Sequence, residues 1–336
     1  MTGFVQPTAA WQVTLDGADL TSKIKPRLVR LSLEEATGEQ ADKLEIVVSD
    51  HDGKMALPAE GAVLSVALGW AKGTGVEIGL VPKGTYKVDE VEWSGPPDQI
   101  RISAHSADFA GSFRKRKNRT WHGKTLGAIV AQLAADNGLT AACHADLAGT
   151  VVTSAEQASK SDMQFLRDLG RRYDAVATVK AGNLIFSPVN ATTTPSGSTI
   201  PTIAITRSKG DGISYRRAAR ENGQDGAEAQ YYDQGTAKRH TATAGGSSRR
   251  RLKRVYASSA DASAAATSES NRLARAAATF SLNLAYGNAR LSAGARATVT
   301  GCKSEIDAKT WRIKSVRHSF DKSGGFRSQL ELEAAG

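Results

Sequence analysis

Three short stretches of the chain hold residue types that could do chemistry. The first, "HGKTL" (122–126), contains the Gly-Lys-Thr of a phosphate-binding loop, in which backbone amides surround the phosphates and the lysine reaches the terminal ones. Such a loop needs another glycine five residues before Gly123, and that position is Asn118. We therefore reject nucleotide binding and expect Thr125 to cap a helix instead.

The second stretch, "SDHDGK" (49–54), has two carboxylates spaced as at the start of a calcium-binding loop. That loop requires a third oxygen ligand at position 54 and a glycine at position 55. The residues there are Lys54 and Met55. The segment therefore predicts a polar turn between two strands rather than a metal site.

The third stretch is the adjacent pair Cys143 and His144. Neighbouring residues do not easily act as nucleophile and base, and a zinc site needs more ligands than the chain supplies at suitable spacing. No Gly-x-Ser-x-Gly elbow is present. The second cysteine, Cys302, lies in an unlike context, so we expect two reduced thiols. Taken together, these patterns predict no nucleotide, calcium or zinc site, and they disfavour an active site.

Two basic runs, "RKRKNR" (114–119) and "RRRLKR" (249–254), are the strongest charge features. We rank contact with acidic faces of neighbouring subunits first, a solvated loop second and a nucleic-acid surface third. Nucleic acid ranks last because aromatic residues do not alternate with the charges and no helix-turn-helix or zinc-finger spacing is present. The candidate subunit-contact residues are Arg114, Lys115, Arg116, Lys117, Arg119, Arg249, Arg250, Arg251, Lys253 and Arg254.

The elements that must position these residues belong to a chain of 336 residues, with 40% hydrophobic and 23% charged side chains. This composition is ordinary for a soluble globular protein. The net charge of +10 is uneven, because residues 1–100 carry 15 acidic and 9 basic side chains and the remainder carries 19 and 35. Such asymmetry favours different partners for the two ends. No run of about 18 apolar residues predicts a membrane span, and the N-terminus does not resemble a secretory signal.

The first hundred residues predict six short β-strands separated by turn signals. The apolar runs are "AWQVTL", "RLVRLSLE", "KLEIVVSD", "AVLSVALGW", "TYKVDEVEW" and "QIRISAHS". Short strands with regular turns are typical of a sandwich or a small barrel. We assign residues 1–113 to this first β domain.

The composition changes near residue 112. The stretch "TLGAIVAQLAADNGL" places apolar residues on one helical face, and a second helix is predicted after Ser161, which forms a capping box with Gln164. Two short strands around an Ala-Gly-Asn turn follow. Residues 114–190 are therefore predicted to form a small α+β module.

Residues 191–336 predict a linker followed by a second β domain. The segment "NATTTPSGST" (190–199) has linker composition, and "TATAGGSSRRR" (241–251) reads as a loop. Strands return in "TIAITRS", "ARATVTG", "TWRIKSVRHSF" and "FRSQLELEA". An alanine-rich stretch predicts a helix over about residues 261–285, with Phe280 and Leu284 on its apolar face.

Two stretches near opposite ends of the chain, "TYKVDEVEW" (85–93) and "TWRIKSVRH" (310–318), repeat one pattern. Their matching apolar positions are Tyr86 with Trp311, Val88 with Ile313, and Val91 with Val316. In both stretches, strict alternation would place the two ends of the strand on opposite faces. A one-residue bulge restores a single face, at Asp89-Glu90 in the first copy and at Lys314-Ser315 in the second.

The surroundings of the two strands repeat as well. "EGAVLSVALG" precedes the first and "AGARATVTG" the second, and a tight turn with an alternating strand follows each. Chance similarity between two hairpins is the alternative to duplication. The favoured fold is mainly β, with two similar β-barrel domains flanking the α+β module. Three such chains would place six similar units around an axis, and the acidic first copy could then meet the basic second copy of a neighbour.

The chain resembles the phage late control protein D family, the baseplate hub of contractile tails, and more distantly the base of type VI secretion spike proteins. The resemblance covers about residue 10 to the end of the chain. The stretches that carry it are "GTYKVDEVEWSGPPDQIRISAHSAD", "RKRKNRTWHGKTLGAIVAQLAADNGL", "QASKSDMQFLRDLGRRYDAVATVKAGNLIF", "ISYRRAAR" and the final "WRIKSVRHSF...GGFRSQLELE".

This resemblance implies a non-enzymatic homotrimer with two tail-tube-like barrels per chain and no cofactor. It implies a position in the virion tail or a tail-like particle, where the hub adapts a sixfold tail tube to a threefold central spike. The implied partners are further copies of the chain, the central spike protein, a tail tube or tube-initiator protein and other baseplate proteins. Synthesis is expected in the bacterial host cytoplasm.

Two other function classes remain open at this point. A basic nucleic-acid-binding protein would bind duplex with a steep salt dependence that is lost on charge reversal of the first basic run. A tail-associated cell-wall hydrolase would turn over peptidoglycan as an isolated chain.

Overall fold

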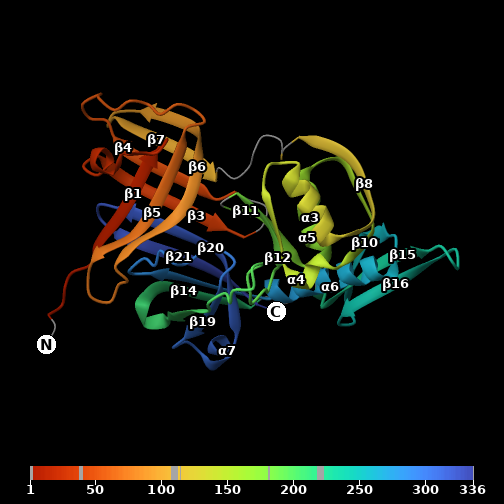
Figure 1. Ribbon diagram of the computed structural model, residues 1–336. Helices are drawn as coiled ribbons and strands as arrows, with labels where there is room; N and C mark the ends of the chain where they lie inside the picture. The colour runs from red at the N-terminus through yellow and green to blue at the C-terminus, as the bar shows by residue number, and fades with distance from the viewer. Residues whose placement is uncertain are drawn as a thin grey trace.

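The computed structural model describes residues 3–37, 41–106, 113, 115–180, 182–217 and 223–335. Strands make up 53% of it and helices 18%, which confirms the prediction of a mainly β fold. The strands of the described residues form four sheets, of which the largest has 13 strands (Figure 1).

The first part of the large sheet is the N-terminal β unit, which contains all six strands predicted for the first hundred residues. It also contains a two-residue strand and one short helix. Its elements are β1 (Thr8–Leu15), β2 (Ala18–Asp19), α1 (Thr21–Ile24), β3 (Leu28–Ala36), β4 (Lys43–Ser49), β5 (Val63–Lys72), β6 (Gly79–Ser94) and β7 (Gln99–Ser106).

The second part of the large sheet is the C-terminal β unit, whose strands lie between residue 203 and residue 334 and are interrupted by an insertion. Its elements are β13 (Ile203–Thr206), η1 (Arg207–Lys209), β14 (Gly210–Arg217), β18 (Ala278–Leu284), β19 (Arg296–Thr300), α7 (Ser304–Asp307), β20 (Thr310–Asp321) and β21 (Gly325–Ala334).

The two units have the same strand order. Setting aside β2, the N-terminal unit runs β1, β5, β6, β7, β4, β3, and the C-terminal unit runs β13, β19, β20, β21, β18, β14. One pairing differs, since β1 is antiparallel to β5 whereas β13 is parallel to β19. The repetition inferred from two echoed strands therefore extends over six strands in each unit.

The two units are joined edge to edge through β20. Its first residues pair with β19, and its remainder pairs antiparallel with β3 of the N-terminal unit. The apolar cores also meet there, because Phe320 and Phe326 lie in the core of the N-terminal unit, where Phe326 packs against Trp70. The two units thus form one continuous sheet, and two separate closed barrels remain a prediction.

Between the units in sequence lies the middle module, in which helices pack on two small sheets (Figure 1). Its core comprises apolar side chains from both main helices. Its elements are β8 (Arg116–Thr125), α3 (Leu126–Ala135), β9 (Thr140–Cys143), α4 (Ala145–Ala148), β10 (Val151–Ser161), α5 (Asp162–Tyr173), β11 (Ala175–Lys180) and β12 (Asn183–Pro188).

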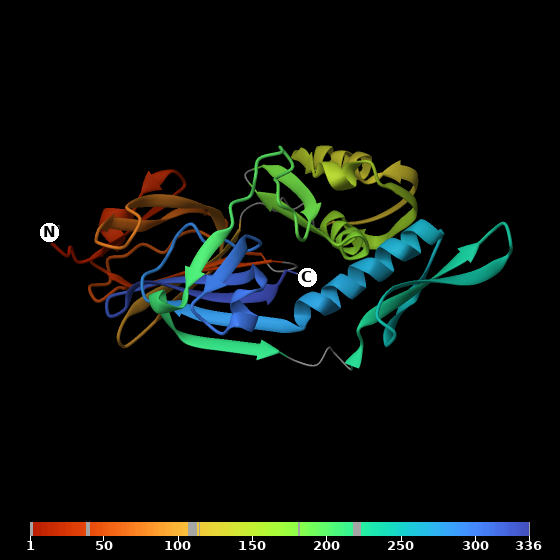
Figure 2. The same ribbon diagram turned by 90° about the horizontal axis from the view of Figure 1, so that it is seen from below.

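The insertion between β14 and β18 forms an arm, in which one long helix covers a three-stranded sheet (Figure 2). The arm consists of β15 (Gly226–Asp233), β16 (Lys238–Gly245), β17 (Arg249–Tyr256) and α6 (Ser259–Ala276). Its helix also contacts the middle module, where Arg275 forms an ion pair of 2.6 Å with Asp174 and Tyr173 donates to Asp261 at 2.7 Å. The predicted domain of residues 191–336 is therefore distributed over two separate sheets.

Two local predictions in this region are wrong. The alanine-rich helix ends at Ala276 rather than near 285, and β18 follows it. A spacing of four between Phe280 and Leu284 fits both a helical and an alternating pattern, and burial of every second side chain of β18 selects the strand. The segment 241–251 is also not a loop, since its two ends lie in β16 and β17.

Candidate assembly site

The two echoed strands carry the same irregularity. The ladder between β6 and β7 shifts between Val88 and Glu90, and the ladder between β20 and β21 shifts between Ile313 and Ser315. The one-residue bulges predicted from the sequence are therefore confirmed at equivalent positions. A bulge bends its strand and increases the local twist, so both strands change direction at the same point.

The chain approaches both bulges in the same way. The amide of Gly61 donates to the carbonyl of Val88 at 2.8 Å, and the amide of Gly294 donates to the carbonyl of Ile313 at 2.8 Å. Both glycines have positive φ, 83° and 90°, which favours glycine because it lacks a Cβ atom. Gly61 of "EGA" and Gly294 of "AGA" therefore occupy equivalent positions in the two repeated neighbourhoods.

Beyond the bulge, the two strands differ. In β20, residues 315–321 pair with β3, and His318 and Phe320 are buried. In β6, pairing with β5 ends at Lys87, and Trp93 is 55% exposed. One copy of the repeated strand thus has a partner strand inside the chain, and the other copy presents a free edge among the described residues.

A buried charge network lies at the junction between β20 and β3. Lys83 Nζ is 2.7 Å from Glu35 Oε2 and 2.8 Å from the carbonyl of Leu291. His318 Nε2 lies 3.3 Å from that carbonyl and 3.6 Å from Glu35 Oε2, while its Nδ1 is 2.8 Å from Ser328 Oγ. Because Nε2 faces two acceptors, it carries the proton and Nδ1 accepts from the serine hydroxyl.

Burial and neighbouring charges set the ionisation of this network. Burial lowers the pKa of His318 and keeps the ring neutral. Burial disfavours the charged form of Glu35 as well, but the hydrogen bond from His318 and the charge of Lys83 outweigh it and lower the pKa of the carboxyl. Nearby, burial and the Glu35 charge raise the pKa of Asp42 to about 6. At the junction, ionisation is therefore favoured for the carboxyl of Glu35 and disfavoured for the carboxyl of Asp42.

The structure places the two predicted basic runs on separate sheets. The described part of the first run lies at and just before β8, and the second lies in β17. Arg114 lies outside the described residues. The helix α6 stands between the middle module and the arm sheet, so the runs are not one continuous patch.

Several of these basic side chains are already paired within the chain. The internal partners are Asp162 for Lys117, Asp136 for Arg119, Glu269 for Arg250, Glu228 for Arg251 and the ring of Tyr256 for Arg254. Lys115, Arg116, Arg249 and Lys253 are exposed, with no ion pair to any residue that the structure describes. These four remain available for a partner.

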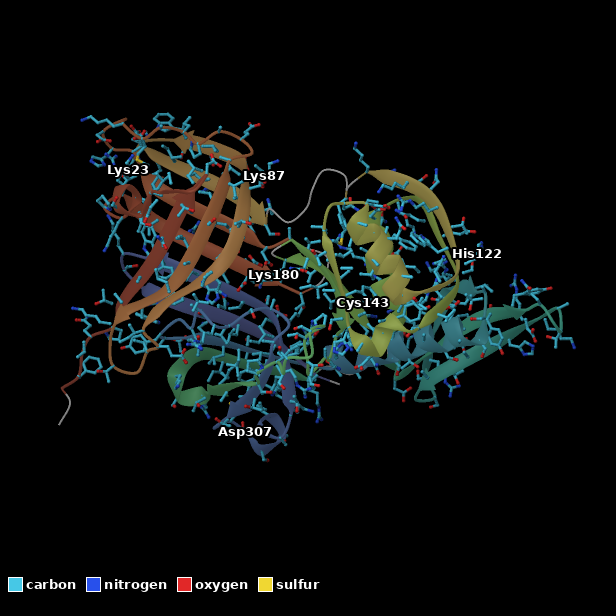
Figure 3. All side chains as sticks on the ribbon, in the orientation of Figure 1. Lys23, Lys87, His122, Cys143, Lys180 and Asp307 are labelled. Carbon is cyan, nitrogen blue, oxygen red and sulfur yellow. The ribbon has the colours of Figure 1, made fainter. Side chains whose placement is uncertain are left out.

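The chemical candidates from the sequence have structural roles. Thr125 caps α3 by accepting from the amide of Ala128 at 3.2 Å, as predicted. His144 caps α4 and has Thr193 Oγ1 3.0 Å from its other ring nitrogen. In the polar turn, Asp52 forms two hydrogen bonds with Arg27. Figure 3 shows Cys143 and His122 apart from each other in the middle module.

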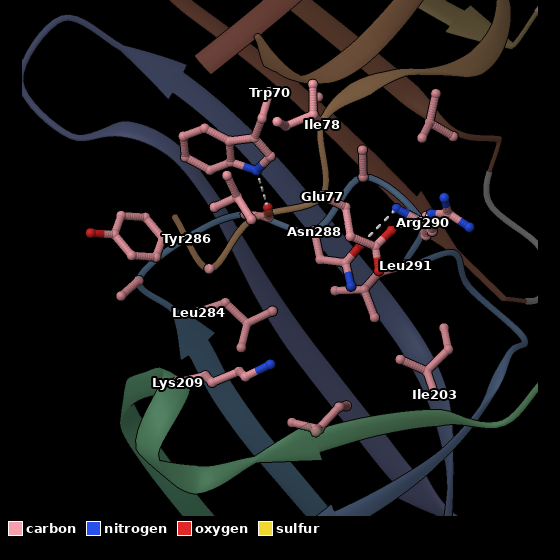
Figure 4. Close-up of a pocket in the computed structure, with 18 of the residues that line it drawn as sticks. Trp70, Glu77, Ile78, Ile203, Lys209, Leu284, Tyr286, Asn288, Arg290 and Leu291 are labelled. Carbon is pink, nitrogen blue, oxygen red and sulfur yellow. Dashed lines mark hydrogen bonds and ion pairs between the residues drawn. The ribbon is translucent and has the colours of Figure 1, made fainter. Parts of the chain in front are cut away.

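A cavity of about 400 Å³ lies between the β5–β6 turn and the C-terminal unit (Figure 4). Trp70, Ile78, Leu284 and Tyr286 line it, and the Trp70 ring nitrogen donates to the carbonyl of Gly287 at 2.8 Å. Three charged side chains also line it, of which Glu77 and Arg290 pair with each other and Lys209 is the third. The cavity therefore has a mixed apolar and polar lining.

The described ranges contain neither a candidate metal site nor a candidate membrane-spanning helix. No group of three or more His, Cys, Asp or Glu side chains is placed to hold a metal ion. None of the helices in those ranges combines the length and apolarity that crossing a bilayer requires.

Comparison with known proteins identifies the family. Residues 44–324 match the family model described as phage tail baseplate hub (GPD). The chain is also 34% identical to a probable baseplate hub protein of Escherichia phage P2, over 97% of this chain and 93% of that protein. The chain belongs to the phage tail baseplate hub family. This is a family of structural proteins rather than of enzymes, and the resemblance recognised in the sequence is confirmed.

Solved structures share the fold of this hub protein. A tail protein from Neisseria meningitidis MC58 superposes with a TM-score of 0.71 at 13% identity, covering 97% of this chain and 96% of that one. A component of the E. coli type VI secretion system gives a TM-score of 0.56 at 12% identity, covering 91% of this chain and 73% of that one. The fold is therefore common to phage tails and type VI secretion.

Sequence reasoning missed the residues at the junction. Glu35, Lys83 and His318 are far apart in the chain, and nothing in their local patterns distinguishes them from surface charges. The available signal was the echo itself, because it makes β20 equivalent to β6. Any residue of β20 that departs from its counterpart in β6 is then a candidate for a contact that only one copy makes.

We expect Lys83→Met to destabilise the hub protein by about 3–5 kcal/mol, because it leaves the Glu35 carboxylate buried without its cation. Chemical denaturation followed by tryptophan fluorescence measures the change. The double variant Lys83→Met with Glu35→Gln removes the stranded charge and should lose less stability than the single variant. A double variant that is at least as unstable as the single one would contradict the role of this pair.

We expect Asp42→Asn to stabilise the protein near pH 7.5 by about 1–3 kcal/mol. The folded-state pKa of Asp42 is raised from 3.8 to about 6, so the folded chain binds more protons than the unfolded chain between these values. Stability from Asp42 is therefore full below about pH 4 and is lost as the pH rises through 6. Asparagine can still accept from the amide of Ala36.

Thermal unfolding of both forms across this pH range tests the expectation. The stabilisation by Asp42→Asn should be much smaller near pH 4, where the wild-type carboxyl is protonated in the folded state and partly protonated in the unfolded state. An equal gain at pH 4 and pH 7.5 would show that ionisation of Asp42 is not the cause.

Proposed function

We propose that this baseplate hub protein works as a homotrimer that adapts a sixfold tail tube to a threefold central spike. The observation that carries the proposal is the shared order of six strands in the two β units, together with the matching bulges in β6 and β20. Three chains then present six similar units, so one ring offers sixfold repetition on one side and true threefold symmetry on the other. Closed rings of this kind form through head-to-tail interfaces.

The partners follow from this role. The six similar units would contact the tail tube or a tube-initiator protein, and the threefold end would receive the central spike protein. Other baseplate proteins would surround the ring, in the virion tail or a tail-like particle after synthesis in the host cytoplasm. Shape and symmetry matching, rather than catalysis, would be the mechanism.

The exposed basic residues fit the same role. Lys115 and Arg116 precede or begin β8, and Arg249 and Lys253 lie on the arm. Each is exposed, so each can meet an acidic face of a neighbouring subunit without first breaking an internal ion pair. Contacts of this kind steer association and set its orientation more than they add affinity.

We expect the purified chain to have the mass of a trimer in solution, either alone or together with candidate spike and tube proteins. Light scattering coupled to size-exclusion chromatography measures this mass, and negative-stain images of the same fractions report the symmetry. A chain that remains monomeric with every candidate partner would overturn the proposal.

A further inference from the structure

The junction inside the chain provides a template for a contact between chains. Residues 315–321 of β20 pair with β3, in the register His318 opposite Leu33 and Arg317 opposite Glu34. Since β6 is the counterpart of β20, its residues after the bulge are the counterpart of this paired segment. In the described chain, that part of β6 pairs with β7 on one side and with no strand on the other.

The counterpart of β3 is also unpaired along one edge. The equivalence follows from the rows of directly opposed residues that cross each unit, which are Leu33, Leu44, Ala104 and Val88 in the N-terminal unit and Tyr215, Phe280, Leu332 and Ile313 in the C-terminal unit. These rows make β14 the counterpart of β3, with Tyr215 in the place of Leu33. β14 ends the large sheet, and it lies along the outer side of the C-terminal unit (Figure 2).

We infer that the free edge of β6 in one chain pairs antiparallel with the free edge of β14 in a neighbouring copy. The inference rests on the proposed trimer and specifies its interface. The register follows from the internal junction, with Trp93 opposite Tyr215, Glu92 opposite Arg216 and Ser94 opposite Ser214. The large sheet of each chain is then continuous with the sheets of its two neighbours, through β14 on one side and β6 on the other.

The charges on the two pairs of edges support this assignment, because they are exchanged. At the internal junction, the acidic Glu34 of β3 faces the basic Arg317 of β20. At the equivalent positions between chains, the acidic Glu92 of β6 faces the basic Arg216 of β14. Residues of opposite charge therefore occupy directly opposed positions at both junctions, an arrangement that stabilises a strand pair.

The wrong pairings place like charges opposite each other. If β6 paired with β3 of another copy, Glu92 would face Glu34, and if β20 paired with β14, Arg317 would face Arg216. Like charges directly opposite each other destabilise a strand pair, and they disfavour wrong partners. The exchanged charges thus specify which edge meets which.

The exposed apolar side chains of the two edges also fit the inference. Trp93 is 55% exposed although its counterpart, His318, is fully buried beside β3. An unpaired strand edge with an exposed tryptophan is a site for strand addition. Placing Trp93 against the half-buried Tyr215 of a neighbour would cover both aromatic rings, as the internal junction covers His318 and Leu33.

Disulfide cross-linking tests the register. In a chain with Cys143→Ser and Cys302→Ser, the pair Ser94→Cys and Ser214→Cys should give covalently linked trimers after mild oxidation, as seen on a denaturing gel. The matched control is Ser32→Cys with Ser319→Cys, which occupies the same kind of position at the internal junction and should close within one chain. Ser94→Cys with Arg217→Cys is out of register and should link poorly.

The outcomes separate this inference from the proposed function. The experiment uses the full chain, alone and coexpressed with candidate spike and tube proteins. The mass of each sample in solution is also measured by light scattering. Trimers that cross-link through 94 and 214 support the inference. Trimers that do not, while the internal control closes, overturn the β6–β14 contact and leave the trimer standing.

A monomer under every condition overturns both the β6–β14 contact and the proposed trimer.

Charge reversal provides a second readout that does not depend on oxidation. Glu92→Arg and Arg216→Glu should each raise the chain concentration needed for half-assembly by about tenfold or more, and the two together should restore it. Single variants that assemble like the wild type would overturn the proposed charge pairing.

Discussion

The hydrogen-bonded ladder between β20 and β3 is the contact on which the rest of the structure depends. β21 pairs with β20 from Trp311 to Asp321, but on the other side of β20 its own unit uses only the first residues, which pair with β19. The bulge at Lys314 turns the remainder toward the N-terminal unit, and the amide of Thr37 donates to the Lys314 carbonyl at 2.8 Å where the second ladder begins. One strand therefore belongs to two units, and without it both would expose an open edge.

The burial of this ladder explains the charge network around it. A one-residue slip of β20 would turn His318 outward and bring Arg317 inward, away from Ser328 and the Leu291 carbonyl. Phe320, which stacks on Phe326 at 4.3 Å between ring centroids, would leave the core in the same slip. A buried ion pair is weak evidence for stability, but the loss of one partner is costly. A shift of register would break the network of Glu35, Lys83 and His318 and would therefore destabilise the folded chain.

Much of the local structure could be predicted because its causes are local. The six N-terminal strands, the cap at Thr125 and both bulges follow from alternation and from short-range hydrogen bonding. The end of α6 could not, because Phe280 and Leu284 fit two periodicities and only packing in the C-terminal unit decides between them. The junction was out of reach for a related reason, since Glu35 and His318 are distant in sequence and each resembles an ordinary polar residue until the sheet brings them together.

The two copies of the repeated strand differ in when their edges are covered. The edge of β20 is covered by β3 as soon as the chain folds, and the histidine on it, His318, is therefore buried. The edge of β6 after the bulge is unpaired in the described chain, and it carries acidic residues beside Trp93, which keep an open edge soluble. In the proposed ring, the unlike edges β6 and β14 of neighbouring chains meet, so the contacts are head-to-tail, and such contacts close into a ring or continue as a filament according to the rotation between units. Within one chain the rotation is set by the β20–β3 ladder, and the β6–β14 contact proposed between chains would have to repeat it for the ring to close.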